Sequence, residues 1–286
     1  MTPEPIPGVD GYAANMAASV DDQFGDNRPA PAPKAEVQEM SQFSKELVAR
    51  VKEIFFAYTN RMERNAQTTL GPSEIGTPCD RRLVMHLLGV DPVNPGGDNW
   101  ASFRGTCTHV GLAEMFDWAN ANTGRFATEI PLTFPSVLVP KGTGDLLDRV
   151  LLLFVDHKTM GSFSLTKLKT EGLTPTQRVQ LNMYAYGATL RGEVVERIAV
   201  LGWPIQNSTL QALWAVDELY DEQIALDALA RVERLGDEIT DQTATHGYEP
   251  LQIAGSFSVD ASDCKFCPYY MPNAKSLDSG GCNGKA

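Results

Sequence analysis

The apolar residues of this chain recur at two different spacings, and the spacing changes along the sequence. In the first patterned stretch they recur every three or four positions, which predicts an amphipathic helix. The apolar residues of this helix are Phe43, Leu47, Val51, Ile54, Phe55, Tyr58 and Met62. A second helical stretch is expected to begin after Pro72-Ser73 and to end at Gly89, and a third to span about residues 106–118.

The middle of the chain has the pattern of strands separated by turns. One strand is expected over residues 126–134, and two more flank Asp145 and Asp156. Further along we expect a helix, a pair of strands and a long acidic helix, over residues 174–190, 194–203, 209–216 and 217–243. Helices before, between and after the strands predict an α/β fold with a mixed sheet.

The two ends of the chain lack such patterns. Residues 1–40 are rich in Pro, Ala, Asp and Gly, a composition typical of a disordered tail. Residues 41–286 are expected to form a single domain, whose last thirty or so residues are irregular and contain three of the five cysteines.

Composition and charge narrow the class of protein. Hydrophobic residues make up 43% and charged residues 21%, which is typical of a globular protein. No apolar run approaches the roughly 18 to 20 residues of a membrane span, and the first residues lack the features of a signal peptide. We therefore expect a cytoplasmic protein that makes no membrane contact. The net charge of -12 comes mostly from residues 1–40 and 217–250, so it does not exclude a DNA partner.

Two carboxylates and a lysine stand on adjacent predicted strands. Asp145 follows the Gly-rich turn 142–144, and Asp156 and Lys158 end the apolar run 150–155. Side chains two apart on a strand share a face. Two acids can hold a hard divalent cation, and a lysine beside them can orient a water or steady a negative charge. Asp148 is a rival for the first carboxylate, but we expect it in the turn; Asp-x-Lys alone also fits a solvated strand end.

Two further positions fit a metal and phosphate site. His109 falls on the third predicted helix, and Gln180 and Tyr184 are four residues apart on the next one, so they share a face. Taken singly, each of these residues also fits a helix surface or a core.

In order, these segments resemble the RecB-like branch of the PD-(D/E)XK nucleases. The matching segments are Gly105…His109, Gly142-x-x-Asp145, Asp156-His157-Lys158-Thr159 and Gln180-x-x-x-Tyr184. The resemblance implies a restriction-endonuclease-like core, with a central mixed sheet flanked by helices. It also implies a metal-dependent exonuclease that acts on single-stranded DNA or DNA ends.

The resemblance further implies a role for each residue. Its metal ligands for Mg²⁺ or Mn²⁺ would be His109, Asp145, Asp156 and the main-chain carbonyl of His157. Lys158 would aid water activation or stabilise the transition state. The remaining two, Gln180 and Tyr184, would contact the DNA backbone and order the lysine.

The cysteines suggest a second site. Cys264 and Cys267 form a CxxC motif, which fits a zinc half-site, a redox pair or a cluster half-site. No strand-to-helix junction surrounds it, which disfavours a thioredoxin-like pair, and the chain's intracellular character disfavours a disulfide framework.

A subset of the RecB-like nucleases carries one cysteine before the nuclease core and three after it, which together bind a 4Fe-4S cluster. This subset includes CRISPR-associated and phage exonucleases and subunits of helicase–nuclease complexes. The pattern here is similar, and implies a cluster held by Cys79, Cys264, Cys267 and Cys282, the last three within residues 260–286. Cys282 follows Cys267 at a longer spacing than expected, which leaves Cys107 as an alternative ligand. Four thiolates would also satisfy zinc.

The expected partner is DNA, bound mainly through its backbone and with little sequence specificity. Some residues are candidates for stacking on bases or reaching phosphates, although the aromatics also fit a core and the arginines a solvated helix surface: Trp203, Trp214, Tyr184, Tyr186, Arg81 and Arg82. The resemblance implies work in DNA recombination, repair or processing, a helicase or recombination partner, a homo-oligomer, and a phage gene expressed in a bacterial host. Two other readings remain: a non-catalytic DNA-binding scaffold with a structural cluster, and an iron–sulfur electron carrier.

Overall fold

The computed structural model describes residues 39–59, 69–94, 99–120, 123–277 and 281–285 of the chain. The predicted disordered tail therefore lies almost entirely outside the described residues. The chain divides into two units, Met1–Tyr58 and Thr59–Ala286. Helix α1 (Gln42–Thr59) is the described element of the first unit and confirms the helix predicted from Phe43 onward.

A five-stranded sheet forms the centre of the second unit, with the strands in the order β1-β2-β3-β4-β5. Its strands are β1 (Phe126–Thr133), β2 (Lys141–Asp148), β3 (Leu153–Met160), β4 (Arg197–Pro204) and β5 (Trp214–Leu219). β3 and β4 run parallel, and every other neighbouring pair is antiparallel. The predicted mixed sheet is thus confirmed.

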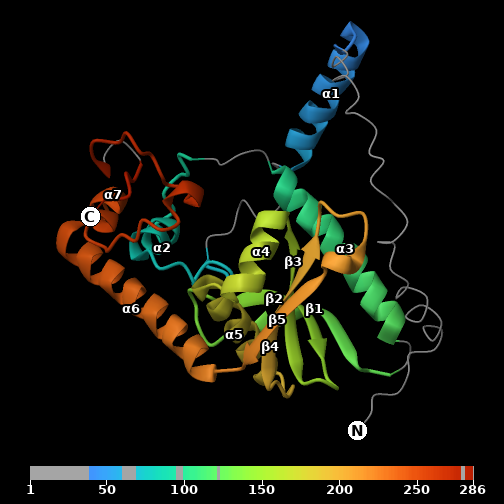
Figure 1. Ribbon diagram of the computed structural model, residues 1–286. Helices are drawn as coiled ribbons and strands as arrows, with labels where there is room; N and C mark the ends of the chain where they lie inside the picture. Colours follow the sequence, from blue (N-terminus) through green and yellow to red (C-terminus); the bar gives the residue numbers. More distant parts are fainter. Residues whose placement is uncertain (1–38, 60–68, 95–98, 121–122, 278–280, 286) are drawn as a thin grey trace, which may run out of the picture. The chain divides into compact units, whose positions relative to one another are not determined.

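The helices of this unit among the described residues are α2 (Asp80–Leu87), α3 (Trp100–Asn120), α4 (Ser162–Glu171), α5 (Pro175–Thr189), α6 (Glu222–His246) and α7 (Pro250–Gly255). α3 covers one face of the sheet, α4 and α5 cover the other, and α6 packs on α5 with α2 and α7 beyond it (Figure 1). Alternation along β3 separates the two faces: Phe154 packs into the core on the side of α5, while Val155 packs with Phe116 of α3 on the other side. The sheet is therefore buried between helices on both sides.

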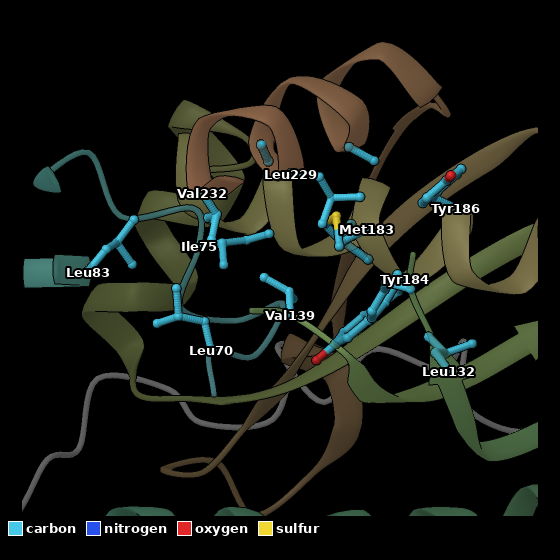
Figure 2. Close-up of a cluster of buried hydrophobic side chains, with 14 of the residues drawn as sticks. Leu70, Ile75, Leu83, Leu132, Val139, Met183, Tyr184, Tyr186, Leu229 and Val232 are labelled. Atoms are coloured by element: carbon cyan, nitrogen blue, oxygen red, sulfur yellow. The ribbon is translucent and has the colours of Figure 1, made fainter. Parts of the chain in front are cut away.

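The larger core lies between the sheet, α5 and α6, and Figure 2 shows part of it. Leu181 and Met183 on α5 and Phe154 on β3 are fully buried. Burying such a side chain stabilises a fold by about 1.5–3 kcal/mol. α5 begins at Pro175 behind a capping box in which Thr174 and Gln177 exchange hydrogen bonds, as the predicted start at Thr174 requires. This core holds α5 rigidly against β3.

α4 was not predicted, and it packs against the same side of the sheet as α5. Leu165 and Leu168 are its two buried residues, too few to give a clear helical period. A Cβ at Gly202 of β4 would lie 2.9 Å from Leu165 Cδ1. α4 can approach the sheet this closely because that position has no side chain.

Several predicted boundaries were wrong, including the start of the third helix, which is Trp100 rather than about residue 106. The second helix begins at Asp80, because Pro78 disfavours helical backbone in the residue before it. The last strand begins at Trp214, after a single 3-10 turn over Leu210–Ala212. The acidic helix begins at Glu222 rather than at residue 217, because residues 217–219 pair with β4.

The C-terminal segment folds back onto α2 (Figure 1). After α7 come a 3-10 turn over Cys264–Phe266 and an isolated bridge between Tyr270 and Cys282. The bridge brings the chain back beside the CxxC motif despite the long spacing. No helix within the described residues is long and apolar enough to cross a membrane.

Candidate functional site

The candidate site lies where β2 and β3 part. Their antiparallel pairing covers Leu146↔Val155 to Asp148↔Leu153, and Asp145 and Asp156 are the next residue on each strand. Beyond this point Asp145 Oδ2 accepts a hydrogen bond from the backbone N–H of His157 at 2.7 Å. A side chain thus replaces the ladder between the strands, and the backbone of β3 is left accessible from the β2 side.

His109 of α3 reaches into this gap. Its Nδ1 lies 3.4 Å from Asp145 Oδ1, and its Nε2 lies 3.0 Å from the carbonyl oxygen of His157. The hydrogen bond to Asp145 raises the pKa of His109 above its usual value, against the effect of burial. Three of the groups expected to bind a metal are therefore adjacent, although they come from three separate elements.

Glu129 is a candidate ligand that the sequence reasoning missed. One ligand atom from each of His109, Glu129 and Asp145 lies within 4.8 Å of the others. Glu129 sits on β1 between the pairs Thr128↔Leu146 and Ile130↔Gly144, so it lies across from Asp145. Its φ of 43° is rare for a residue with a side chain and is typical of functional sites. An acid on the strand before the Gly-rich turn was the available signal.

Asp156 belongs to the same cleft but is held by a different set of residues. Lys158 Nζ lies 3.0 Å from Asp156 Oδ1 and 2.9 Å from Oδ2. Gln180 Nε2 donates to the same Oδ1 at 3.1 Å and to the Tyr184 hydroxyl at 2.9 Å. Lys158 Nζ also lies 3.4 Å from Gln180 Oε1. The acid, lysine, glutamine and tyrosine singled out by the sequence thus form one connected network.

The two aspartates have opposite electrostatics. Burial raises the pKa of Asp156 to about 6, although the ammonium of Lys158 counteracts it. Burial also acts to raise the pKa of Asp145, but the hydrogen bond with His109 and its charge outweigh it, so that this pKa is lowered. The ring of His157 is neutral, because burial lowers its pKa to about 4, and its Nδ1 accepts a hydrogen bond from Trp203. His157 therefore offers its carbonyl rather than its ring.

An open cleft of about 730 Å³ surrounds these groups. Its lining residues include His109, Glu129, Asp145, Asp156, Lys158, Gln180, Tyr184 and Lys141. Glu74 also lines it, but its carboxylate accepts from the backbone of Gly71 and lies 3.3 Å from His86 Nδ1. Glu74 thus fixes the rim of the cleft.

The donors in this cleft fit a divalent cation. Carboxylate and carbonyl oxygens suit Mg²⁺ and Mn²⁺, and an imidazole favours Mn²⁺ among the two. Asp156 Oδ2 is buried beside Lys158 Nζ at 2.9 Å, and a carboxylate oxygen has a further lone pair that a cation could share with the ammonium. Together with Asp145, Glu129 and the His157 carbonyl, it gives a hard donor set on one side of the cleft.

The structure also decides between the readings left open for several other residues. Asp148 is not a turn residue but the last residue of β2, where it binds Arg125 at 2.6 Å and accepts from two turn N–H groups. Tyr184 and Tyr186 are buried within α5, so their rings cannot stack on bases. Arg81 is buried and cannot reach phosphates. Trp214 remains exposed.

A second cluster lies at the end of α2. Cys79, Cys264, Cys267 and Cys282 line one cavity, whereas Cys107 is exposed on α3. Burial and then the three other cysteines raise the pKa of Cys264, so the thiols sit within electrostatic range of one another. The structure therefore brings together the four cysteines that the sequence pattern selected and leaves the alternative apart.

Long-range contacts hold the cysteines in place. Cys79 precedes the first residue of α2, and Asp80 is fixed by Arg231 of α6 at 2.6 Å. On the other side, Gly284 has a φ of +77°, and a Cβ there would lie 2.9 Å from Cys264 Sγ. Only glycine fits this approach to the cluster without strain.

A buried cation faces these cysteines. Arg81 is only 6% exposed and donates to the carbonyls of Ala254, Gly255 and Lys285. Its Nη1 also lies 3.8 Å from Cys282 Sγ. No carboxylate among the described residues pairs with it, although a buried charge normally requires a counter-charge. Thiolates carrying a metal group would supply that negative charge.

Comparisons with known proteins give distant likenesses. No known protein family matches the sequence, and neither does any curated protein. The alkaline exonuclease LHK-Exo of Laribacter hongkongensis has 13% sequence identity and a TM-score of 0.44, covering 62% of this chain and 91% of that chain. The structure of LHK-Exo in complex with dAMP has 15% sequence identity and a TM-score of 0.44, covering 62% of this chain and 93% of that chain. The structure of SSO0001 has 16% identity and a TM-score of 0.40, covering 87% of this chain and 100% of that chain. The function is therefore derived from this chain's own residues.

Proposed function

We propose that this protein is a metal-dependent deoxyribonuclease of the RecB-like type, which hydrolyses phosphodiester bonds of single-stranded DNA or DNA ends. The observation that carries the proposal is the joining of Asp145, Asp156, Lys158, His109 and Gln180 in one open cleft. These five residues come from four elements, and a purely structural network would not need a lysine and two acids at the opening of a cleft. Such an activity would serve DNA recombination, repair or processing.

Each residue has a defined task in this proposal. A divalent cation, once bound, would lower the pKa of a water and neutralise phosphate oxygens. His109, Glu129, Asp145, Asp156 and the His157 carbonyl would hold it. Asp145 is ionised in advance by its contact with His109, which prepares one ligand for the cation.

The remaining residues act on the water and the phosphate. Lys158 bears a compact positive charge beside Asp156, where it can orient the attacking water or stabilise negative charge on the phosphate. Gln180 bridges Asp156 and Tyr184, so it limits the positions that Lys158 can take. The Tyr184 hydroxyl is the tip of a buried ring that opens onto the cleft.

The test is digestion of end-labelled single- and double-stranded DNA with Mg²⁺ or Mn²⁺. Lys158→Ala and Asp156→Asn should each lower kcat/KM by about 100-fold or more, since a positioned acid–base or electrostatic group contributes about 10²–10⁴-fold. Asp227→Asn is the matched control, because Asp227 is an exposed acid on α6 whose contact is with Gln223. Undiminished cleavage in the Lys158 and Asp156 variants would overturn the assignment. A wild-type protein that binds DNA without cleaving it would favour a scaffold instead.

We also propose that Cys79, Cys264, Cys267 and Cys282 hold a 4Fe-4S cluster. One observation supports a polynuclear group over zinc. No three cysteines within the described ranges have their sulfurs within 4.8 Å of one another, whereas thiolates on one zinc at about 2.3 Å each must lie closer than that. A cluster spreads its ligands over four irons. The buried Arg81 calls for a negative site beside it, which four thiolates around either metal group would supply.

Purification without oxygen should then give a brown protein with about four irons and four sulfides per chain and with no zinc. Cys282→Ser should lose the visible absorption, while Cys107→Ser should keep it, because Cys107 lies on a different helix. A colourless protein loaded with zinc would overturn the cluster. A cluster retained in Cys282→Ser but lost in Cys107→Ser would overturn the ligand set.

A further inference from the structure

The outer surface of α4 carries aromatic rings paired with lysines. Phe163 is 76% exposed, and Lys167 Nζ lies 5.5 Å from the centroid of its ring. On the neighbouring strand β5, Trp214 is 45% exposed, and Lys169 Nζ lies 4.8 Å from its ring. Two exposed rings with lysines over them thus lie on adjoining elements, since α4 packs against β5.

Local charges make this surface positive. Among the described residues, neither Lys167 nor Lys169 forms an ion pair with an acid. The acids of β5 are neutralised elsewhere: Glu218 binds Arg178 at 2.6 Å, and Asp217 binds Arg197. Glu171 at the end of α4 is the remaining acid of this helix, so the two lysines leave α4 with a net charge of +1 to attract an anion.

The surface of α4 is held in place by hydrogen bonds and packing, and α4 follows closely in sequence on the strand that bears Lys158. α4 starts two residues after the end of the strand segment that bears Lys158. Gln206 Oε1 accepts hydrogen bonds from the backbone and hydroxyl of Ser162 at 2.9 and 2.8 Å, which ties the start of α4 to the loop after β4. Leu165 packs over Gly202, the residue paired with Lys158 in the sheet. Because paired residues face the same side of a sheet, α4 lies on the face toward which Lys158 points.

We propose that Phe163, Lys167, Lys169 and Trp214 form a docking track for the single-stranded part of a nucleic-acid substrate. The lysines would contact phosphates, and the two rings would stack on bases, the combination used by proteins that bind single strands without sequence preference. A protein partner would more often meet an apolar patch without free lysines. The track extends the proposed nuclease function, because it names single-stranded rather than duplex DNA as the form guided to the cleft.

Equilibrium binding tests the track separately from catalysis. The full-length protein is titrated with a fluorescent single-stranded oligonucleotide in EDTA, so that no cleavage occurs. Phe163→Ala and Trp214→Ala should each weaken binding by about 5- to 150-fold, which corresponds to about 1–3 kcal/mol for one base–aromatic stack. Lys167→Ala/Lys169→Ala should lower the slope of log K against log salt by about 1.4, since each single-strand phosphate contact contributes about 0.7.

Matched controls separate the track from a general loss of charge or aromatic area. Trp118→Ala removes a ring that is 70% exposed on α3, and Lys45→Ala/Lys52→Ala removes two exposed lysines of α1. Neither control should change affinity by more than about twofold. The track variants should also hydrolyse a small thymidine phosphodiester at the wild-type rate with Mn²⁺, because it is too short to reach α4.

The outcomes distinguish the track from the nuclease proposal. If the wild-type protein hydrolyses no DNA, the nuclease proposal is wrong, but the binding measurements still test whether the track binds single-stranded DNA. If the track variants bind the oligonucleotide as tightly as the controls do, the track is overturned, even in an active enzyme. The track is also overturned as a site for single strands if its variants lose affinity for duplex DNA as much as for single-stranded DNA.

Discussion

Replacing Asp156 by asparagine should stabilise the metal-free protein while it abolishes cleavage. Burial raises the pKa of Asp156 from 3.8 to about 6, so the fold favours the protonated, neutral form of this carboxyl. Asparagine resembles that neutral form in shape and cannot ionise. The substitution should therefore remove the cost of keeping a buried charge, while losing a group that the proposed chemistry needs.

The magnitude follows from the size of the shift. About two pKa units correspond to about 3 kcal/mol, at 1.36 kcal/mol for each unit. Between pH 4 and 6 the folded chain holds a proton that the unfolded chain has already released, so stability falls as pH rises through this window. Above pH 6 the full cost is present, and below pH 4 it is absent. At pH 8 the gain should raise Tm by about 6 to 12 °C, at about 2–4 °C for each kcal/mol in a domain of this size.

The assay is thermal unfolding in EDTA at pH 8 and pH 4, with the visible spectrum recorded to check that any cluster is retained. Asp145→Asn is the matched comparison and should behave in the opposite way. Its pKa is lowered, so the fold favours its ionised form, and neutralisation should destabilise the protein at pH 8. The reasoning is refuted if both variants shift Tm in the same direction, or if the gain from Asp156→Asn is the same at the two pH values.

Three further predictions concern other parts of the structure. Gly202→Ala should lower the free energy of unfolding by about 1–3 kcal/mol, because its Cβ would lie 2.9 Å from Leu165; an unchanged urea midpoint would contradict this. Glu129→Gln should weaken Mn²⁺ binding by about tenfold in a calorimetric titration, and unaltered affinity would exclude Glu129 as a ligand. Arg81→Met should lower the midpoint potential of the cluster by about 60 mV, equivalent to about 1.4 kcal/mol for one electron; an unchanged potential would remove Arg81 as its counter-charge.

Much of the fold could be predicted from periodicity and turn residues. The capping residue Thr174 located α5, because local preferences agree there with the tertiary structure. The apolar run before Asp156 located β3 only in part, because Val150 and Leu151 are exposed in the turn after β2 and the strand begins at Leu153. α4 could not be predicted, because the packing of Leu165 depends on the absence of a side chain at Gly202, far along the chain on β4. Such a contact leaves no periodic signal in the helix itself.

The candidate site also contains residues that the sequence could predict and residues that it could not. Asp145, Asp156 and Lys158 follow from strand ends and spacing, and the structure brings them into one cleft. Glu129 could not be found in this way, because its position depends on the register of β1 against β2 and on an unusual backbone angle. The burial of Arg81 is likewise a property of the returning C-terminal segment, so a polar residue that reads as exposed on a helix becomes part of the interior.

The return of the C-terminal segment to α2 also determines the order in which the molecule can be made. All five strands lie within residues 126–219, so the sheet can form from neighbouring sequence while the chain is still being synthesised. α2 ends at Leu87 but packs on α6 and α7, and Cys79 meets a partner at residue 282. At about 5–20 residues per second, α2 waits roughly 10 to 40 s for these contacts. The cysteine site is therefore assembled last, and iron would enter a molecule whose nuclease core has already formed.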